Sequence, residues 1–213
     1  ERTLLLFVNS PCVVIGRFQN PWIECNLSLM KRNHILFVRR QSGGGTVYHD
    51  ENNLNFSFIA DKKIHNKEYN HDLVVRALKK LDVNTVATKR GDIRLVEEES
   101  RKISGSAFKE KKDSAFHHGT LLIKTNLDLL NKYIHSNKQE LQTKSIASIR
   151  SVVANITEIN STIEVKKLTD ALVEEFNLSH NKEIHHIDQK SELYTELVES
   201  EYYKGLKTQE WKY

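Results

Sequence analysis

The chain has 213 residues, of which 38% are hydrophobic and 28% are charged, and its formal net charge is +4 at pH 7. This composition favours one globular domain with a buried core over an intrinsically disordered chain. The 2 cysteines exclude a disulfide scaffold and a four-thiolate zinc site, and they favour a reducing compartment. No apolar run approaches the roughly 18 residues of a membrane span, and so weak a positive charge does not by itself indicate nucleic-acid binding.

The first predicted elements are two short strands. Residues 4–8 and 12–15 are apolar runs separated by the turn residues Asn9, Ser10 and Pro11, and this pattern predicts a hairpin.

A helix is predicted next, because Asn20 followed by Pro21 is typical of a helix start. Trp22, Cys25 and Leu29 follow at spacings of three and four residues, which predicts one apolar stripe along that helix. Residues 35–38 are predicted to form a strand that leads into two arginines.

The remaining elements alternate along the chain. Residues 54–58 alternate between apolar and polar side chains, which predicts a half-buried strand. We expect helices over residues 71–81, from the cap Asn126 to about residue 134, and from about residue 164. Further strands are predicted over residues 92–96, 102–108 and 119–123, with a polar hairpin loop at residues 109–113. This mixture with short turns predicts an α+β fold with a largely antiparallel or mixed sheet.

The most informative stretch is residues 39–50, in which Gly43, Gly44 and Gly45 follow two arginines. Consecutive glycines allow close approach to a ligand, and their N–H groups can form an anion-binding concavity. Arginines add permanently charged forks for phosphate or carboxylate. The segment matches neither the Walker P-loop nor the spaced-glycine dinucleotide motif. With Ser42 and His49 beside it, the pattern favours a ligand-binding loop; the alternative is a flexible hairpin tip with solvated arginines.

Lys102 lies in the strand predicted over residues 102–108, where Ser104 and Ser106 would share its face. A lysine that points into a cleft there would neutralise a carboxylate and a phosphate together. Taken alone, the pattern favours an edge-strand lysine in water, the commonest environment of a lysine.

Asp92, the pair His117 and His118, and Thr120 are further candidates for ligand contacts. Asp92 follows Gly91 just before a strand, so it is either a Mg²⁺ ligand or a turn residue. The adjacent pair His117 and His118 faces opposite sides of a strand and does not predict a metal site. Thr120 is the better candidate to contribute a hydroxyl or a backbone N–H.

Taken together, these segments resemble the lipoate–protein ligase A and lipoyltransferase family. The resemblance covers nearly the whole chain and rests on the order and spacing of residues 20–26, 39–50, 101–108, 117–122 and 148–151. It implies a single catalytic domain over residues 1–213, of the biotin/lipoate ligase-like type, with mixed, largely antiparallel sheets flanked by helices.

The resemblance also implies an enzyme with acyl-adenylate chemistry. Family members join lipoate to ATP with Mg²⁺, release pyrophosphate, and pass the lipoyl group to a specific lysine of an acceptor. The expected partners are lipoyl domains of 2-oxo acid dehydrogenase E2 subunits and the glycine cleavage H protein, with neither nucleic acid nor a membrane. A lipoyltransferase that uses preformed lipoyl-AMP or a lipoylated donor protein is the alternative, and a non-catalytic lipoyl-domain binding module is the alternative outside the enzyme class.

The roles of individual residues follow from the same resemblance. Lys102 is implied as the catalytic residue, contacting both the carboxylate and the α-phosphate, and Asp92 as the Mg²⁺ ligand. Val47, Phe56 and Leu122 are expected to line the pocket for the apolar tail. The implied nucleotide- and lipoate-binding residues are Arg40, Ser42, Gly43, Gly44, Gly45, Thr46, Val47, Tyr48, His49 and Thr120.

The chain departs from the family pattern in three places. Gly91 stands where asparagine is usual, the helix that usually precedes residue 4 is expected to be missing, and no C-terminal accessory domain is expected. The loop variant at residues 46–48 favours a mitochondrial enzyme, with a bacterial cytoplasmic origin as the alternative.

Neither cysteine is predicted to carry a thioester. Cys25 lies on the apolar stripe of its helix and Cys12 inside an apolar strand, so both are expected to pack in the core. Serine at either position is therefore expected to retain activity.

Overall fold

The computed structural model describes residues 2–96, 101–135, 144–180, 183–188 and 190–213. Its largest sheet has the strand order β1 (Arg2–Val8), β5 (Asn53–Asp61), β10 (Ser114–Leu122) and β9 (Ser106–Glu110), and each neighbouring pair is antiparallel. A second sheet has the order β3 (Leu36–Arg39), β2 (Cys12–Ile15) and β4 (Val47–His49). A third has the order β6 (Thr85–Ala87), β7 (Ile93–Leu95) and β8 (Lys102–Ser104).

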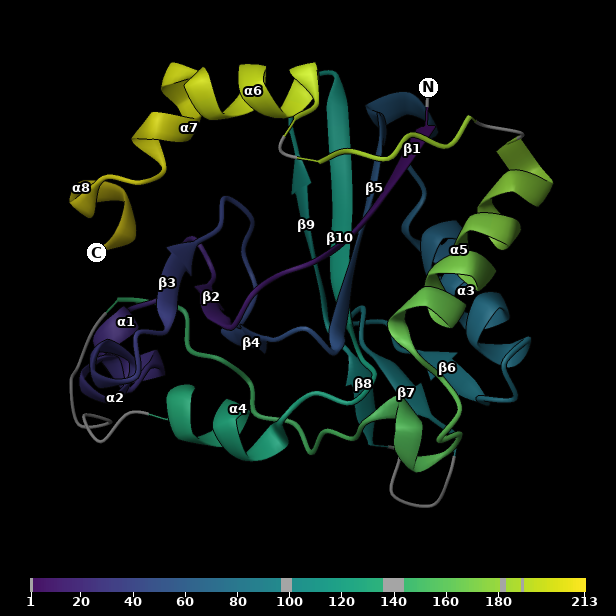
Figure 1. The fold of residues 1–213 in the computed structure, drawn as a ribbon, viewed down its shortest axis with the longest axis horizontal. Coiled ribbons are helices and arrows are strands. Elements are labelled where there is room, and N and C mark those ends of the chain that lie inside the picture. Colours follow the sequence, from purple (N-terminus) through teal and green to yellow (C-terminus); the bar gives the residue numbers. More distant parts are fainter. Residues whose placement is uncertain (1, 97–100, 136–143, 181–182, 189) are drawn as a thin grey trace.

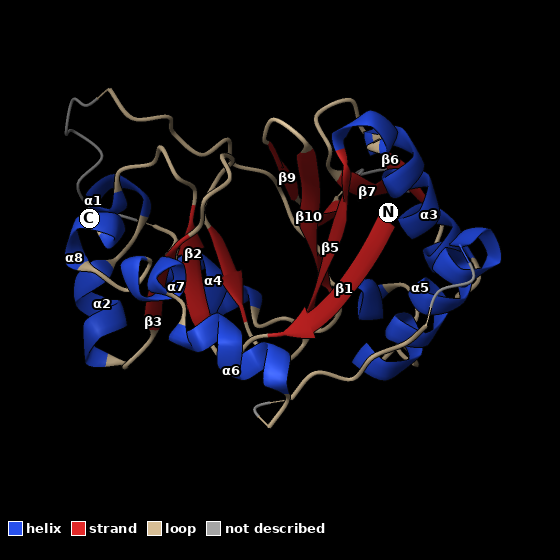
Figure 2. Ribbon diagram, turned by 90° about the horizontal axis from the view of Figure 1, so that it is seen from above, coloured by secondary structure: helices blue, strands red, loops and turns tan. Residues whose placement is uncertain are grey.

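Helices cover these sheets on both sides of the molecule (Figure 1). Helices α3 (Lys67–Lys79) and α5 (Val165–His180) pack beside the largest sheet, whereas α1 (Pro21–Glu24), α2 (Leu27–Arg32) and α4 (Leu127–Tyr133) surround the sheet of β2, β3 and β4 (Figure 2). Because β2 and β3 are parallel and the other pairs are antiparallel, the predicted α+β fold with mixed, largely antiparallel sheets is confirmed.

The main core lies between the largest sheet and the two long helices. Leu73, Leu78, Leu168 and Leu172 are fully buried there against Phe56 of β5. A smaller core around Val13, Met30, Tyr48 and Tyr133 joins β2 and β4 to α2 and α4. The periodicity that predicted α3, α4 and α5 is therefore confirmed, with Asn66 and Asn126 accepting the capping hydrogen bonds of the first two.

The predicted hairpin of the first two strands is wrong. The turn after Val8 carries the chain from one sheet to another, because β1 pairs with β5 and β2 pairs with β3 and β4. Turn residues mark where a strand ends, but they do not determine which strand becomes its partner.

The predicted single helix with one stripe is also wrong. Cys25 has an extended backbone and ends α1, and the side chain of Asn26 then caps α2 by accepting from Leu29 N. The asparagine side chain competes with the helix for backbone hydrogen bonds and starts a new helix.

The strand predicted as half-buried is buried on both faces. Asn55 and Ser57 of β5 are 3% and 8% exposed. Their face of the sheet is covered by the glycine segment, where Ser42 bonds to His118 of β10 at 2.6 Å. Asn55 Nδ2 donates to the carbonyl of Phe7, so its polar group is paired despite its burial.

The C-terminal part consists of α6 (Glu192–Glu199), α7 (Glu201–Gly205) and α8 (Gln209–Lys212), which cross the molecule to reach β3 (Figure 1). Trp211 Nε1 donates to the carbonyl of Arg39 at 2.8 Å, and Arg39 Nε donates to the carbonyl of Lys212 at 3.1 Å. Two short 3-10 turns complete the described structure, Lys62–Ile64 and Ile156–Glu158.

None of the described helices combines the length and apolar character that crossing a membrane requires.

A buried histidine makes the core sensitive to acid. His117 is 0% exposed, its ring stacks on Phe108 at 4.4 Å, and neither ring nitrogen has a hydrogen-bond partner among the described residues. Burial lowers the pKa of His117 to about 2, and neighbouring His71 and His118 lower it further. The folded state therefore holds this imidazole neutral across the physiological range.

We predict that His117→Phe flattens the acid limb of the stability curve. In wild type, the unfolded chain takes up a proton near pH 6.5 and the folded chain does not, so stability falls as the pH falls below that value. The variant should remove a slope of up to about 1.4 kcal/mol per pH unit, measured by urea unfolding between pH 7 and 4. At pH 7 it should be at least as stable as wild type, because two unpaired buried nitrogens are removed. The exposed His185→Gln serves as control, and an unchanged acid limb in His117→Phe would contradict the prediction.

Candidate functional site

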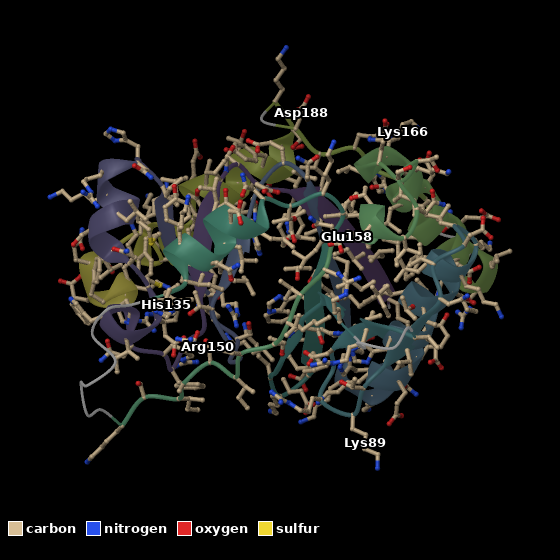
Figure 3. The ribbon with its side chains drawn as sticks, turned by 90° about the horizontal axis from the view of Figure 1, so that it is seen from below. Lys89, His135, Arg150, Glu158, Lys166 and Asp188 are labelled. Carbon is tan, nitrogen blue, oxygen red and sulfur yellow. The ribbon has the colours of Figure 1, made fainter. Side chains whose placement is uncertain are left out.

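A cavity of about 360 Å³ lies where β4, β8, β10 and α4 meet a bridging segment, residues 144–154. Figure 3 shows Arg150 on this segment close to His135 at the end of α4, and their side chains are 3.3 Å apart (Nη2 to Nδ1). The cavity is lined by Ile23, Glu24, Thr46, Val47, Tyr48, Lys102, Ser104, Gly105, Thr120, Leu122, Leu130, Asn131, Ile134, His135, Ala147, Ser148, Ile149, Arg150, Ser151 and Val153.

Arg40 shapes the glycine loop from behind. Its guanidinium donates to the carbonyls of Gly43 at 2.7 Å, Gly45 at 2.6 Å and Val14 at 3.1 Å. In a trans peptide the N–H points away from the C=O, so holding these carbonyls turns the N–H groups of the following residues outward. The N–H of Thr46 accordingly donates to Ser148 Oγ on the cavity wall at 3.0 Å.

Several predicted ligand residues are thus set back from the cavity. Arg40 and the three glycines do not line it. The Arg40 guanidinium is bonded to the loop carbonyls instead, and its burial lowers its pKa to about 10. Gly44 has φ of +86°, and a Cβ there would lie 2.9 Å from Arg40 Nη2, so the loop requires glycine at this position. In this structure Arg40 acts on the loop and touches no cavity surface.

Ser42 and His49 do not line the cavity, and both side chains have other partners. Ser42 bonds to His118 Nε2 at 2.6 Å, and His49 Nδ1 is 2.9 Å from Asn9 Nδ2. Burial lowers the pKa values of His49 and His118 to about 4, with Arg40 lowering both further. The cavity wall thus includes Thr120 but neither Ser42 nor His49, and a ligand contact of these two residues stays a prediction.

The remaining predicted binding residues do line the cavity. Thr46, Val47 and Tyr48 enter it from the end of the loop, and Thr120 and Leu122 enter it from β10. Phe56, predicted beside them, lies instead in the main core.

Lys102 stands in the cavity wall, because the predicted strand over residues 102–108 is divided between two sheets. β8 ends at Ser104 and β9 begins at Ser106, with Gly105 at the corner. The Lys102 side chain folds over that corner, and a Cβ on Gly105 would lie 2.9 Å from Nζ. The lysine side chain is only 22% exposed, so the sequence-based alternative of an edge-strand lysine in water is wrong.

Asp92 holds the ammonium group of Lys102. Lys102 Nζ lies 2.7 Å from Asp92 Oδ1, and Arg94 Nη2 lies 3.4 Å from Asp92 Oδ2. The backbone of Lys102 is also fixed, because its N–H donates to Val152 O and its carbonyl accepts from Ala154 N, each at 3.0 Å. The lysine is therefore oriented by its side chain and its backbone together.

A metal role for Asp92 finds no supporting ligand set. The carboxylate faces two cations, and the described residues contain no group of three or more His, Cys, Asp or Glu side chains placed to hold a metal ion. Gly91, where the family usually has asparagine, has φ of +89°, and a Cβ there would lie 2.7 Å from Ser106 Oγ. The turn before Asp92 therefore favours glycine over asparagine at position 91.

Sequence reasoning missed a polar cluster in the wall. Gln19, Glu24 and Ser148 are joined by hydrogen bonds to one another and to Thr46. The position of Glu24, three residues after the helix start Pro21, does not indicate that its side chain is buried. Residues 148–151 contribute to the family resemblance, which implies no individual role for them.

The family model described as lipoyl protein ligase A/B catalytic domain matches residues 1–177. The lipoate-protein ligase A of Psychrobacter cryohalolentis is 43% identical over 176 residues, which cover 83% of this chain and 51% of the relative. The lipoate-protein ligase A of Bdellovibrio bacteriovorus is 40% identical over 217 residues, covering 100% of this chain and 63% of the relative. The chain thus spans about half of the first relative's length and less than two thirds of the second's.

Solved structures of similar proteins have the same fold. P. falciparum LipL1 in complex with lipoate matches with a TM-score of 0.79 and 32% identity, over 100% of this chain and 61% of that chain. A bipartite lipoate protein ligase from Thermoplasma acidophilum, analysed with its E2 lipoyl domain, has a TM-score of 0.79, 27% identity and coverage of 100% and 84%. A lipoate-protein ligase A bound with ATP has a TM-score of 0.77, 25% identity and coverage of 100% and 85%.

We predict that Arg40→Lys loosens the glycine loop. An ammonium cannot span the three carbonyls that the guanidinium reaches, so at least one buried acceptor loses its partner. Unfolding by urea should show a loss of about 1–3 kcal/mol, and amide hydrogen exchange should accelerate at residues 43–46. Arg17→Lys is the matched control, because the Arg17 guanidinium lies over the exposed ring of Phe18. Unchanged exchange in Arg40→Lys would show that the loop does not depend on this clamp.

Proposed function

Because the chain belongs to the lipoyl protein ligase A/B catalytic domain family, we propose that it attaches lipoate to a lysine of an acceptor protein through a lipoyl-adenylate. One observation carries the proposal: the Lys102 ammonium and the Thr46 end of the glycine loop line the same cavity. The combination places a cation held by Asp92 beside the end of the glycine loop, and a mixed anhydride of carboxylate and phosphate requires a fixed positive charge of this kind.

The first step brings two anions together. The lipoate carboxylate attacks the α-phosphate of ATP, the bond from the α-phosphorus to the pyrophosphate oxygen breaks, and pyrophosphate leaves. Negative charge accumulates on the α-phosphate oxygens in the transition state, and Lys102 would reduce that repulsion from a fixed position. Asp92 holds the ammonium in place before the substrates arrive.

The second step needs no enzyme nucleophile. The acyl carbon of the adenylate is already activated, so the acceptor lysine attacks it as a free amine, loses a proton, and expels AMP. Apolar side chains of Val47, Leu122 and Ile134 in the wall suit the hydrocarbon part of the acyl group.

Three finer features belong to the proposal. Magnesium would enter with the ATP phosphates, and a direct contact with Asp92 stays a prediction. Acceptors would be E2 lipoyl domains, as in the Thermoplasma acidophilum system, and the glycine cleavage H protein. A mitochondrial location stays a prediction.

We predict that Lys102→Ala lowers the rate of lipoyl-adenylate formation roughly 100- to 1,000-fold, the usual consequence of removing one charge-stabilising donor. The assay is lipoate-dependent pyrophosphate release with ATP and Mg²⁺, followed by mass spectrometry of an E2 lipoyl domain. Lys124→Ala, an exposed lysine beyond β10, should behave as wild type.

The outcomes separate the candidate functions. Unchanged lipoylation by Lys102→Ala would reject the proposed enzymatic role of this residue. Lipoylation by wild type only when lipoyl-AMP is supplied would assign the chain to the transferases.

We predict that Cys12→Ala and Cys25→Ala both retain lipoylation. Burial raises the pKa of Cys12 to about 11, and burial followed by the nearby Glu24 charge raises that of Cys25 to about 12. A thiol in this state is a poor nucleophile. Loss of turnover in a variant that melts at the wild-type temperature would revive a thioester route, so melting and lipoylation are measured together.

A further inference from the structure

We infer that Ser148, held by Glu24 and Gln19, is a positioning residue that fixes the bridging segment against the glycine loop and so sets the affinity of the cavity for the adenylate. The inference rests on the proposed function and deepens it, because it names the groups that hold the wall of the site together.

Ser148 uses its full hydrogen-bonding capacity. Its hydroxyl donates to the Glu24 carboxylate and accepts from Gln19 Nε2 at 2.8 Å and from Thr46 N at 3.0 Å. Its backbone N–H donates to Glu24 Oε1 at 2.9 Å. A hydroxyl offers one donor and two acceptor sites, so every site is filled.

Gln19 forms a second hydrogen-bonded contact between the same cluster and the end of the glycine loop at Thr46. Its Oε1 accepts from Thr46 Oγ1 at 2.9 Å and from Gly16 N at 3.0 Å. The side chain is 4% exposed, so the loss of any partner would leave a buried polar atom unpaired.

Glu24 determines the direction of the Ser148 hydroxyl. This carboxylate is in a residue only 8% exposed, and among the described residues it has no ion pair with a cation. A carboxylate can only accept, so the hydroxyl hydrogen must point at Glu24. Both oxygen lone pairs of Ser148 are thereby left for Thr46 and Gln19.

The cluster fixes one end of the bridging segment, and Lys102 fixes the other. Ser148 approaches the loop closely, since a Cβ on Gly45 would lie 3.1 Å from its Oγ. Four residues further on, Val152 accepts from the Lys102 backbone at 3.0 Å. Ile149, Arg150 and Ser151 lie between these two anchors and form cavity wall. Releasing Ser148 would therefore move the wall relative to the ammonium.

The test uses four variants of the full chain. Ser148→Ala removes the hydroxyl, and Ser148→Thr keeps it and is the matched control. Glu24→Gln leaves one side-chain oxygen for the two donors of Ser148, its hydroxyl and its backbone N–H, so one of the two contacts must break in either orientation of the amide. The double variant Glu24→Gln/Ser148→Ala tests whether both residues act through the same contact.

Binding of a non-hydrolysable acyl-sulfamate analogue of the adenylate is measured by calorimetry. Ser148→Ala and Glu24→Gln should each bind it roughly ten-fold or more weakly, Ser148→Thr should bind within about three-fold of wild type, and the double variant should be no weaker than Ser148→Ala. In the pyrophosphate assay, the KM for ATP should rise more than kcat falls, whereas Lys102→Ala should mainly lower kcat.

The inference is overturned by wild-type affinity in Ser148→Ala, by equal losses in the alanine and threonine variants, or by additive losses in the double variant. Should Ser148→Ala not fold, Glu24→Gln, which preserves side-chain volume, carries the same comparison. Wild type that does not bind the analogue overturns the proposed function itself, which distinguishes the two failures.

Discussion

The site depends on a corner in the chain at which two backbones nearly touch. Gly105 separates β8 from β9, and its carbonyl accepts from Thr120 N at 3.0 Å. A Cβ on Gly119 would lie 2.9 Å from that carbonyl and 2.4 Å from the Phe56 ring. A side chain at Gly119 would collide with the Gly105 carbonyl and the Phe56 ring, and one at Gly105 would displace the end of the Lys102 side chain that folds back over the corner. A lysine in an uninterrupted strand would point into the solvent or into the core, and neither place serves as the wall of a cavity.

Around that corner, buried polar groups hold loops that carry almost no apolar surface of their own. Arg39 donates to the carbonyls of Gly16, Arg17 and Gln19, and Arg40 to those of Gly43 and Gly45. Each guanidinium thus replaces the hydrogen bonds that a regular sheet would supply to these carbonyls. The two arginines that the sequence suggested as forks for the ligand form the frame of the loop, and the described cations that line the cavity are Lys102 and Arg150.

The predictable parts of the fold are those with a local cause. Periodic leucines determined α3 and α5, and the asparagines before α1, α3 and α4 act as caps because their side chains reach a backbone N–H within the next few residues. Apart from the division of the first predicted helix, where Asn26 caps α2 locally, the failures concern partners that are distant in sequence. Asn9 to Pro11 form a turn whether the next strand joins the same sheet or another, and Ser57 alternates with apolar neighbours although the glycine segment covers it. The apolar and polar pattern of residues 102–108 likewise contains no sign of the change of sheet at Gly105. Within the site, the sequence pattern identified the cavity-lining residues next to the glycines. It did not identify Gln19, Glu24 and Ser148, because Ser148 is more than 100 residues away in sequence from the other two.

The ion pair of Lys102 with Asp92 determines what the lysine of the proposed site contacts before a substrate binds. A half-buried ammonium without a partner would be costly, and a pair that was fully buried and fully satisfied would resist rearrangement. The side chains of Lys102 and Asp92 are 22% and 10% exposed, so the lysine end faces the cavity while the aspartate end is enclosed with Arg94. In the proposed reaction, Asp92 would keep its contact with Arg94 when an entering carboxylate and phosphate approach the ammonium of Lys102. Asp92 would then limit the reorganisation of Lys102, and a fixed charge lowers a barrier most effectively under that condition.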